Sequence, residues 1–419
     1  MSFLSSLRSL TPMARRLVLM RLVIYLGVQC AYFIGVVGTL TFALGGGVGD
    51  NVLGIAILNG CMIVGSLVGG PLLDRIGPRG YFGLVVAGLV VAAASFQVLS
   101  SSMAGVLAGA VLLGFAWGMG DLVAKAFPAY LTDDPTQLKN LNSVMYTVSN
   151  AAVVAGPLAG GALAARFSTR AVFLLLGVCA LAALVPAARF RPQRLPSGAA
   201  SGQDASAGAS TLRRGFSAVF SLPALTLLFW SCFFSFLGYG AFDPVESLYY
   251  RDVLKVGVEW MGWLSAASGV GGIVGALVVL RIPTRHVTVR TLLATLSAEG
   301  ASCLVYVGTG SVAVALVGQI LIGVAFGMMM PLLTTLVQTH APLDVLGSVN
   351  AVMGFGNNVA GLVPLVCAPA LARTFGVQGT LVAASLLVLA MPLVIGLTQR
   401  RRIDSLVDQE RTANLVVEE

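Results

Sequence analysis

Long apolar stretches follow one another along the chain and are separated by short breaks rich in charged residues, glycine or proline. A helix that crosses a membrane needs about 20 apolar residues, and a lipid-embedded backbone must satisfy its hydrogen bonds internally. Twelve stretches fit this pattern, and they begin near Leu22, Val52, Tyr81, Gly105, Asn142, Ala171, Leu225, Met261, Thr291, Val312, Ser348 and Gln378. We therefore predict an all-α integral membrane protein with twelve transmembrane helices.

The composition excludes most other classes of protein. Hydrophobic residues make up 57% of the chain and charged residues 10%, whereas soluble domains carry about 25% charged residues. A soluble enzyme, a nucleic-acid binder or a disordered chain could not keep a wettable surface with this composition. The six cysteines stand singly within apolar stretches. We therefore expect no disulfide frame, no metal site and no cofactor.

The positions of the basic residues predict the orientation in the membrane. Of the 25 Lys and Arg residues, 20 lie in the N-terminal segment, the even-numbered loops or the C-terminal tail, and 5 lie in the odd-numbered loops. Basic loops stay in the cytoplasm. We therefore expect a multi-pass protein of the cell membrane with both termini in the cytoplasm and no removed signal peptide. The net charge of +8 reflects this topology, and we expect no nucleic-acid partner.

The longest break divides the predicted helices into two sets of six. Its middle, residues 196–210, is rich in Ser, Gly and Ala, which is typical of a flexible cytoplasmic linker. The predicted domains are an N-terminal six-helix bundle at 1–188, the linker at 189–222, a C-terminal six-helix bundle at 223–399 and a cytoplasmic tail at 400–419.

Short sequence repeats indicate that the two bundles are pseudo-symmetric copies. Leu-Asn-Ser-Val at 141–144 recurs as Leu-Gly-Ser-Val at 346–349, and Ala-Gly at 155–156 recurs at the same spacing as Ala-Gly at 360–361. Two repeated halves with a site near the membrane midplane are the plan of a transporter that rocks one half against the other.

The loop after the second predicted span reads Gly-Gly-Pro-Leu-Leu-Asp-Arg-Ile-Gly-Pro-Arg at 69–79. It resembles the loop signature G-x-L-A-D-R-x-G-R-K of the major facilitator superfamily, although Pro78 replaces a basic residue. The resemblance covers essentially the whole chain and implies a twelve-helix transporter. It also implies a cytoplasmic gate, whose predicted residues in this loop are Gly70, Asp74, Arg75, Gly77 and Arg79.

The fifth predicted span carries Gly156, Pro157, Gly160 and Gly161. This stretch resembles the core of the antiporter signature of drug:proton exporters in the same superfamily, but Ala152 replaces an upstream glycine of that signature. Glycines allow close helix contact and proline bends a helix. The alternative is an ordinary glycine-rich helix contact. The segments 128–142 and 243–254 are similar to the macrolide-efflux and Tap-like branch of the superfamily.

Acidic residues within predicted spans are the candidates for proton coupling. A charge at the bilayer centre costs at least about 2.5–3.5 kcal/mol, so each one needs a partner, a water-filled cavity or a proton. Asp243 and Glu246 share one helix face, and two close carboxylates resist simultaneous ionisation. We predict proton coupling by these two and by Glu299. Alternatively, the pair lies in water at the outer surface, with Arg251 as a structural partner.

Asp121 and Lys125 stand four residues apart near the cytoplasmic end of the fourth span, a spacing that permits an ion pair. An acidic residue there resembles the superfamily's partner for the loop signature, so we assign both residues to the cytoplasmic gate. A purely structural pair and a role in coupling are the alternatives for Asp121.

The superfamily resemblance also implies which polar, aromatic or polarizable side chains face the central cavity. The predicted substrate-binding residues are Tyr25, Gln29, Tyr32, Asn150, Met328, Asn357 and Asn358. Such a lining suits amphipathic or cationic molecules. Helix packing is an equal alternative for any one of them.

The predicted function is secondary active transport, with proton-coupled efflux of drugs or other amphipathic, cationic small molecules by alternating access. Antibiotic resistance is the expected phenotype. The alternative is transport of one specific metabolite or lipid. The chain has only two histidines and none of the nucleophile, metal or ATP-binding motifs of an enzyme. We expect a monomer whose partners are its substrate, protons and membrane lipid.

Overall fold

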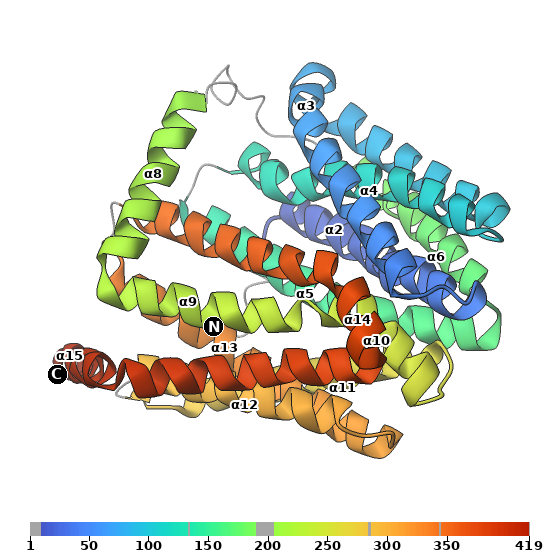
Figure 1. Cartoon of the computed structure of the whole chain (residues 1–419). Coiled ribbons are helices and arrows are strands. Elements are labelled where there is room, and N and C mark those ends of the chain that lie inside the picture. Colours follow the sequence, from blue (N-terminus) through green and yellow to red (C-terminus); the bar gives the residue numbers. More distant parts are fainter. Residues whose placement is uncertain (1–9, 133–134, 190–204, 284–285, 343–344, 419) are drawn as a thin grey trace. The chain divides into compact units, whose positions relative to one another are not determined.

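The computed structural model of the chain describes residues 10–132, 135–189, 205–283, 286–342 and 345–418. Regular structure in these ranges is helical throughout, which confirms the predicted all-α class (Figure 1). The first half contains α2 (Pro12–Cys30), η1 (Ala31–Val37), η2 (Thr39–Ala43), α3 (Val48–Leu99), α4 (Met103–Ala126), η3 (Phe127–Tyr130), α5 (Pro135–Arg166), α6 (Thr169–Ala182) and α7 (Leu184–Ala188). The second contains α8 (Ala205–Ser221), α9 (Pro223–Tyr239), α10 (Phe242–Leu248), η4 (Tyr249–Val253), α11 (Glu259–Arg281), α12 (Val289–Val307), α13 (Val312–His340), α14 (Leu346–Thr398) and α15 (Arg400–Glu418).

Ten helical stretches of the described part are long and apolar enough to cross a membrane. Two long helices change direction at a glycine. Gly77 in α3 has φ 71° and ψ 168°, and Gly376 in α14 has φ 72° and ψ 173°. Only glycine adopts this backbone region without strain. The ten stretches include α14 as a single one, from Ser348 to Thr398, although it bends at Gly376. They do not include α12, a helix of 19 residues. The number of twelve spans stays a prediction.

The chain forms two compact units. The first contains residues 1–200 and 255–266, and the second contains residues 201–254 and 267–419. In the first unit, the rings of Phe96 and Phe173 stack at 3.9 Å between their centroids within an apolar core. In the second, glycines allow tight contact between helices, since a Cβ on Gly323 would lie 1.9 Å from the carbonyl oxygen of Ser268. The predicted domain boundaries stay a prediction.

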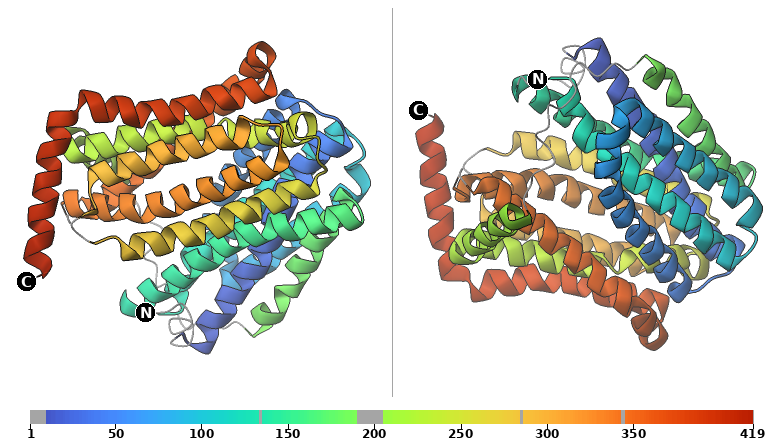
Figure 2. Two further views of the ribbon diagram at one scale, coloured as in Figure 1. Left: turned by 90° about the horizontal axis from the view of Figure 1, so that it is seen from below. Right: turned by 90° about the horizontal axis from the view of Figure 1, so that it is seen from above.

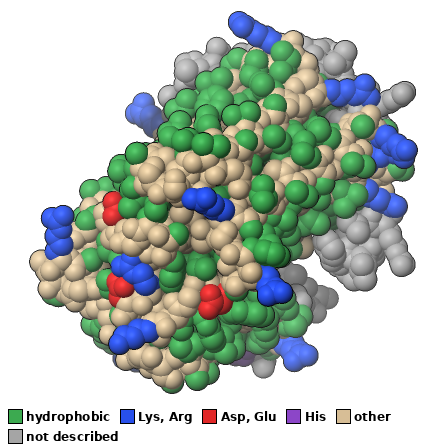
Figure 3. Space-filling view, turned by 90° about the vertical axis from the view of Figure 1, so that its right-hand side faces the viewer, with side chains coloured by type: hydrophobic (Ala, Val, Ile, Leu, Met, Phe, Trp, Pro, Cys, Tyr) green, Lys and Arg blue, Asp and Glu red, His purple; other side chains and the backbone are tan. Residues whose placement is uncertain are grey.

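The surface is apolar where the spans face outward. Figure 3 shows one face on which hydrophobic side chains cover broad areas, with Lys and Arg side chains scattered over it and a few acidic ones. Leu67, Val98 and Val366 are exposed to 70%, 77% and 76%. Side chains of this kind are stable in contact with lipid, which agrees with a multi-pass membrane protein.

The predicted linker contains a helix in its second part. Residues 190–204 lie outside the described part of the chain, but Ala205–Ser221 forms the helix α8. Val219 on this helix is fully buried, and a Cβ on Gly215 would lie 2.5 Å from the carbonyl oxygen of Ser348 at the start of α14. The small residue at 215 therefore lets α8 pack closely on α14, and this contact stabilises a helix in a segment of polar and small residues.

The C-terminal tail is also helical. Figure 2 shows α15 running across the ends of the long helices of the second unit. Ile403, Leu406 and Val407 are buried on one side of α15. The predicted tail therefore contains a docked amphipathic helix.

Candidate functional site

Glu246 is the centre of a polar cluster in the second unit. Its Oε1 atom accepts hydrogen bonds from the Tyr306 hydroxyl at 2.7 Å and from Nε2 of Gln319 at 2.9 Å. The Tyr250 hydroxyl is a further hydrogen-bonding partner. Tyr306 lies on α12 and Gln319 on α13, so one carboxylate in α10 joins three spans. The donors named here are neutral, which leaves Glu246 able to exist either as a carboxylate or as a protonated acid.

The end of this span that carries η4 is fixed to α12 by a tyrosine. The Tyr249 hydroxyl lies 2.9 Å from the carbonyl oxygen of Tyr306 and 2.7 Å from that of Thr309, and it can donate to either. Tyr249 begins the π-helical turn η4, which closes with a bond from the amide of Leu254 to the carbonyl of Tyr249 at 3.0 Å. The turn thus places Tyr249 and Glu246 on the same side of the span, facing α12.

Asp243 lies one turn before Glu246 and is exposed, whereas Glu246 is half-buried. The structure brings the two carboxylates into electrostatic contact, as their spacing predicts. Arg251, the alternative partner of this pair, binds Asp252 through two bonds, Nε to Oδ1 at 2.6 Å and Nη2 to Oδ2 at 3.0 Å.

Glu299 is the most deeply buried of the predicted carboxylates, with 2% of its surface exposed. Its Oε2 atom accepts a hydrogen bond from the Ser235 hydroxyl of α9 at 3.1 Å. The sequence offered no partner for Glu299. The structure supplies one from a different helix of the same unit.

The predicted gate residue Asp121 binds an arginine of α2. Nη2 of Arg21 lies 3.1 Å from Oδ1 of Asp121, and Nε of Arg21 donates to the Ser149 hydroxyl at 2.9 Å. The Arg21 guanidinium also lies 3.9 Å from the centre of the Tyr25 ring. The side chain of Lys125, the predicted partner, lies outside the described residues. Arg21 therefore joins α2, α4 and α5 within the first unit.

The loop signature is described only in part. Gly77 provides the sharp change of direction that the signature implies. Gly70 has open space around its Cα, and both Arg75 and Arg79 are exposed. The side chain of Asp74 lies outside the described residues.

The antiporter-like glycines lie at close helix contacts. A Cβ on Gly156 would lie 2.8 Å from the Cβ atom of Gln29, and one on Gly160 would lie 2.7 Å from Sγ of Cys30, so both face α2. Gly161 faces the start of α11, where a Cβ would lie 2.9 Å from the carbonyl oxygen of Glu259. Pro157 stands inside α5 between these contacts.

The predicted substrate-binding residues fall into two groups. In the first unit, Tyr25 and Tyr32 flank the Trp117 ring at 6.2 and 5.6 Å between centroids. Gln29 on the same helix is buried, and Asn150 bonds the carbonyl of its own helix. The remaining three, in the second unit, are Met328, Asn357 and Asn358. Met328 and Asn357 are half-buried and Asn358 is exposed. A shared chamber formed by both groups stays a prediction.

Sequence reasoning missed several polar partners, namely Arg21, Trp117, Ser235, Tyr250, Tyr306 and Gln319. A signal was present for some of them. Arg21 stands among apolar residues at the start of a span, and Gln319 is the only amide side chain between Val312 and Leu333. Their partners come from other helices, so spacing along one helix could not identify them.

A multi-pass helical membrane protein with buried carboxylates between its spans has the architecture of a secondary transporter. The model of the Major Facilitator Superfamily matches residues 17–365, and the chain belongs to this superfamily. The predicted family is thereby confirmed, and the chain is a transporter of small molecules rather than an enzyme.

Two curated relatives carry names from drug efflux. Multidrug efflux pump Tap of Mycolicibacterium fortuitum is 26% identical over 360 residues, which cover 82% of this chain and 86% of that protein. Multidrug resistance protein D of Escherichia coli is 30% identical over 133 residues, 32% of this chain and 33% of that protein. These relatives agree with the predicted drug-efflux branch.

The fold is shared with solved transporters. The crystal structure of a bacterial homologue of the iron transporter ferroportin has a TM-score of 0.69 and 18% identity, and covers 92% of this chain and 99% of that one. At this identity the likeness concerns the fold alone.

Proposed function

We propose that this transporter is a proton-coupled exporter of drugs or other amphipathic, cationic small molecules. It works by alternating access as a monomer in the cell membrane, surrounded by lipid and with both termini in the cytoplasm. The names of its relatives and the distribution of its basic residues support this proposal. The observation that carries it is the position of Glu246, a carboxylate in a membrane span whose oxygen accepts bonds from two other spans.

Proton binding at Glu246 would change how tightly these spans are held together. Hydrogen bonds to an ionised acceptor are about twice as strong as bonds between neutral groups. A proton on Glu246 therefore weakens its bonds from Tyr306 and Gln319 and loosens α10 from α12 and α13. Deprotonation restores the bonds. Protons arriving from outside thus favour one arrangement of the spans, and substrate favours the other.

The substrate class follows from the aromatic side chains of the first unit. Tyr25, Tyr32 and Trp117 form one cluster on α2 and α4. Aromatic faces attract cations and apolar rings, and they tolerate ligands of different shape. This cluster supports export of lipophilic cations.

The arginine contact of the first unit supports the gate assignment. Arg21 binds both Asp121 and Ser149 and is 8% exposed. An ion pair of this kind holds the ends of its helices in one arrangement and must reorganise if they move. We assign Arg21 to the gate together with the predicted residues of the loop signature and Lys125.

Transport in everted membrane vesicles tests the proposal. Addition of ethidium to energised vesicles should dissipate part of the proton gradient, and Glu246→Gln should abolish this response. Asp243→Asn measures the contribution of its exposed neighbour. Glu259→Gln, which removes a carboxylate at the N-terminus of α11, is the matched control and should respond as the wild type. Efflux that continues at full rate after the proton gradient is dissipated would contradict proton coupling.

A further inference from the structure

A line of polar and aromatic side chains follows one face of the span formed by α9, α10 and η4. Ser235, Tyr239, Phe242, Glu246 and Tyr249 are spaced by four, three, four and three residues. This is the spacing of neighbours on one helix face. On α12, Glu299, Cys303 and Tyr306 are spaced by four and three residues in the same way.

The two lines face each other along much of α12. At one end, the Ser235 hydroxyl donates to Glu299 at 3.1 Å. At the other end, the Tyr306 hydroxyl donates to Glu246 at 2.7 Å. Between these bonds, the Phe242 ring stacks on Tyr239 and on Tyr306, at 5.2 and 6.2 Å between centroids. The two lines together form one interhelical seam.

The seam joins carboxylates at two depths. Glu299 lies near the middle of the 19-residue α12, and Glu246 lies against its last turn. The seven residues from Glu299 to Tyr306 correspond to about 10 Å along a helix. Tyr239 lies in this interval, one turn after Ser235, which bonds Glu299, and with its ring stacked on that of Phe242.

No basic side chain stands among the groups named here beside the two carboxylates. Around Glu246 stand Asp243, the hydroxyls of Tyr239, Tyr250 and Tyr306, and the Gln319 amide. Around Glu299 stand the Ser235 hydroxyl, the Tyr239 phenol, and the thiols of Cys232 and Cys303. Asp243 is the only acidic residue among these named groups, and none of them is a cation. A single proton can therefore reside on Glu246 or on Glu299 without displacing a cationic partner.

We propose that the seam is a proton path in which Tyr239 relays a proton between Glu246 and Glu299. The O–H bond of protonated Glu246 breaks as its proton reaches the Tyr239 oxygen, and the Tyr239 proton passes to Glu299. Glu246 is then ionised, Glu299 is protonated and Tyr239 is unchanged. Water that bridges these groups would complete the path. The inference rests on the proposed proton coupling and assigns to Glu299 the role of the inner proton station.

The test uses the full-length protein in proteoliposomes with ethidium as the transported probe and an internal pH dye. Glu299→Gln and Tyr239→Phe should each slow proton-driven ethidium transport at least about tenfold, because a missing proton relay affects only the proton-transfer steps. Exchange of ethidium across the membrane without a proton gradient should stay within about twofold of the wild type. Thr295→Val changes a buried polar residue one turn before Glu299 and is the matched control.

Infrared difference spectra on acidification supply a readout that does not require transport. The wild type should gain carboxylic-acid bands from both Glu246 and Glu299, and Glu299→Gln should lose one of them. Because Tyr239→Phe removes only a hydroxyl, it tests the relay even if the Glu299 variant folds poorly. Wild-type coupling in both Glu299→Gln and Tyr239→Phe, together with lost coupling in Glu246→Gln, overturns the relay and leaves the proposed function standing. Retained coupling in Glu246→Gln overturns the proposed function and this inference with it.

Discussion

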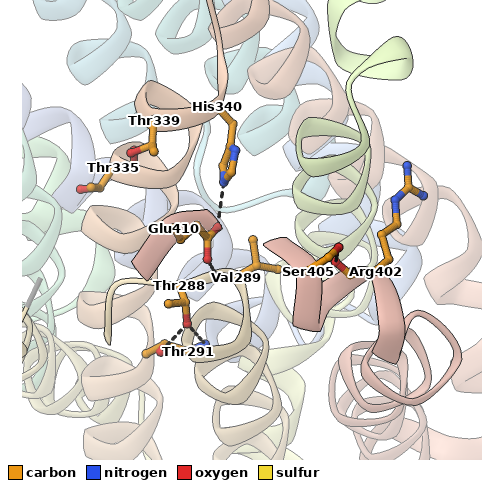
Figure 4. Close-up of polar contacts among 9 residues, drawn as sticks. All are labelled: Thr288, Val289, Thr291, Thr335, Thr339, His340, Arg402, Ser405 and Glu410. Carbon is orange, nitrogen blue, oxygen red and sulfur yellow. Dashed lines mark hydrogen bonds and ion pairs between the residues drawn. The ribbon is translucent and has the colours of Figure 1, made fainter. Parts of the chain in front are cut away.

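Replacement of Glu410 by alanine should release α15 from the rest of the second unit. Figure 4 shows Glu410 pointing from α15 toward the ends of α12 and α13. One carboxylate oxygen lies 2.7 Å from Nε2 of His340, and the other accepts a bond from the backbone amide of Val289 at 3.1 Å. The Glu410 side chain is 1% exposed and His340 is 15% exposed. The carboxylate therefore fastens both helix ends to α15 from a position shielded from water.

The expected loss of stability follows from these contacts. A hydrogen bond to a charged group contributes about 1.5–3 kcal/mol, and the Glu410 carboxylate takes part in two bonds. We expect Glu410→Ala to weaken the docking of α15 by about 3–5 kcal/mol. Glu410→Gln keeps an acceptor for the Val289 amide, so its loss of docking free energy should be about half that of Glu410→Ala. The buried apolar side chains of Ile403 and Val407 and the exposed ion pair between Arg290 and Asp404 would then hold α15.

Hydrogen exchange measures this directly. Each 1.4 kcal/mol corresponds to a tenfold change in an equilibrium constant, so amide protection in α15 should fall by a factor of about 100 to 3,000 in Glu410→Ala. Gln409→Ala removes the exposed neighbour of Glu410 on the same helix and should leave protection unchanged. Protection in Glu410→Ala within about threefold of the wild type would show that apolar contacts alone dock this helix, and would refute the reasoning.

Four further substitutions test separate parts of the structure by thermal unfolding in detergent. Lys255 has φ 55°, so Lys255→Gly should stabilise the protein by about 1 kcal/mol. Gly45 has φ 65°, so Gly45→Ala should destabilise the protein by a similar amount. Effects of the same sign in the two variants would contradict this argument from backbone strain. Arg21→Ala leaves the partly buried Asp121 without its guanidinium and should cost about 3 kcal/mol, and an unchanged midpoint would argue against the contact. Gly161→Leu should lower stability by about 1–3 kcal/mol because the leucine side chain would collide with α11. A midpoint equal to that of the wild type would contradict this contact.

The helices themselves could be predicted because membrane spans depend on local apolar length. The ten long apolar helices follow the stretches identified from the sequence, and the glycine at 77 stands where the loop signature places a turn. The helix α8 was missed because its segment is rich in Ser, Gly and Ala. Its regular apolar positions, Phe216 and Phe220 beside Val219, were present in the sequence but were outweighed by that composition.

The candidate site could be predicted only in part, for a physical reason. Intramembrane carboxylates are rare and costly, so Glu246 and Glu299 stand out in any apolar sequence. Their partners Tyr306, Gln319 and Ser235 are ordinary residues of membrane helices, and they become significant only through the way three helices pack. The same holds for Asp121. The sequence suggested an ion pair with the nearby Lys125, whereas the structure shows an ion pair with Arg21 of another helix.

Spans one and seven end in the same local structure, which supports duplication of the two halves. The amide of Leu44 bonds the carbonyl of Thr39 at 3.0 Å, and the amide of Leu254 bonds that of Tyr249 at the same distance. Each bond closes a π-helical turn and is followed at once by a residue with positive φ, at 65° and 55°. In both copies, Gly and Val stand three and four residues after the leucine that closes the turn.

The chemistry, in contrast, differs between these two copies. At the same spacing from the π-turn, the positions of Asp243 and Glu246 correspond to Phe33 and Val36, and Val36 is fully buried. Only one copy of the repeated turn therefore carries carboxylates. A repeated backbone with acidic residues in one copy fits the proposal that the second half binds protons and the aromatic cluster of the first half contacts the substrate. Transfer of the carboxylate to the other copy, as Val36→Glu in a Glu246→Val background, should therefore fail to restore coupling, since the partners Tyr306 and Gln319 belong to the second unit.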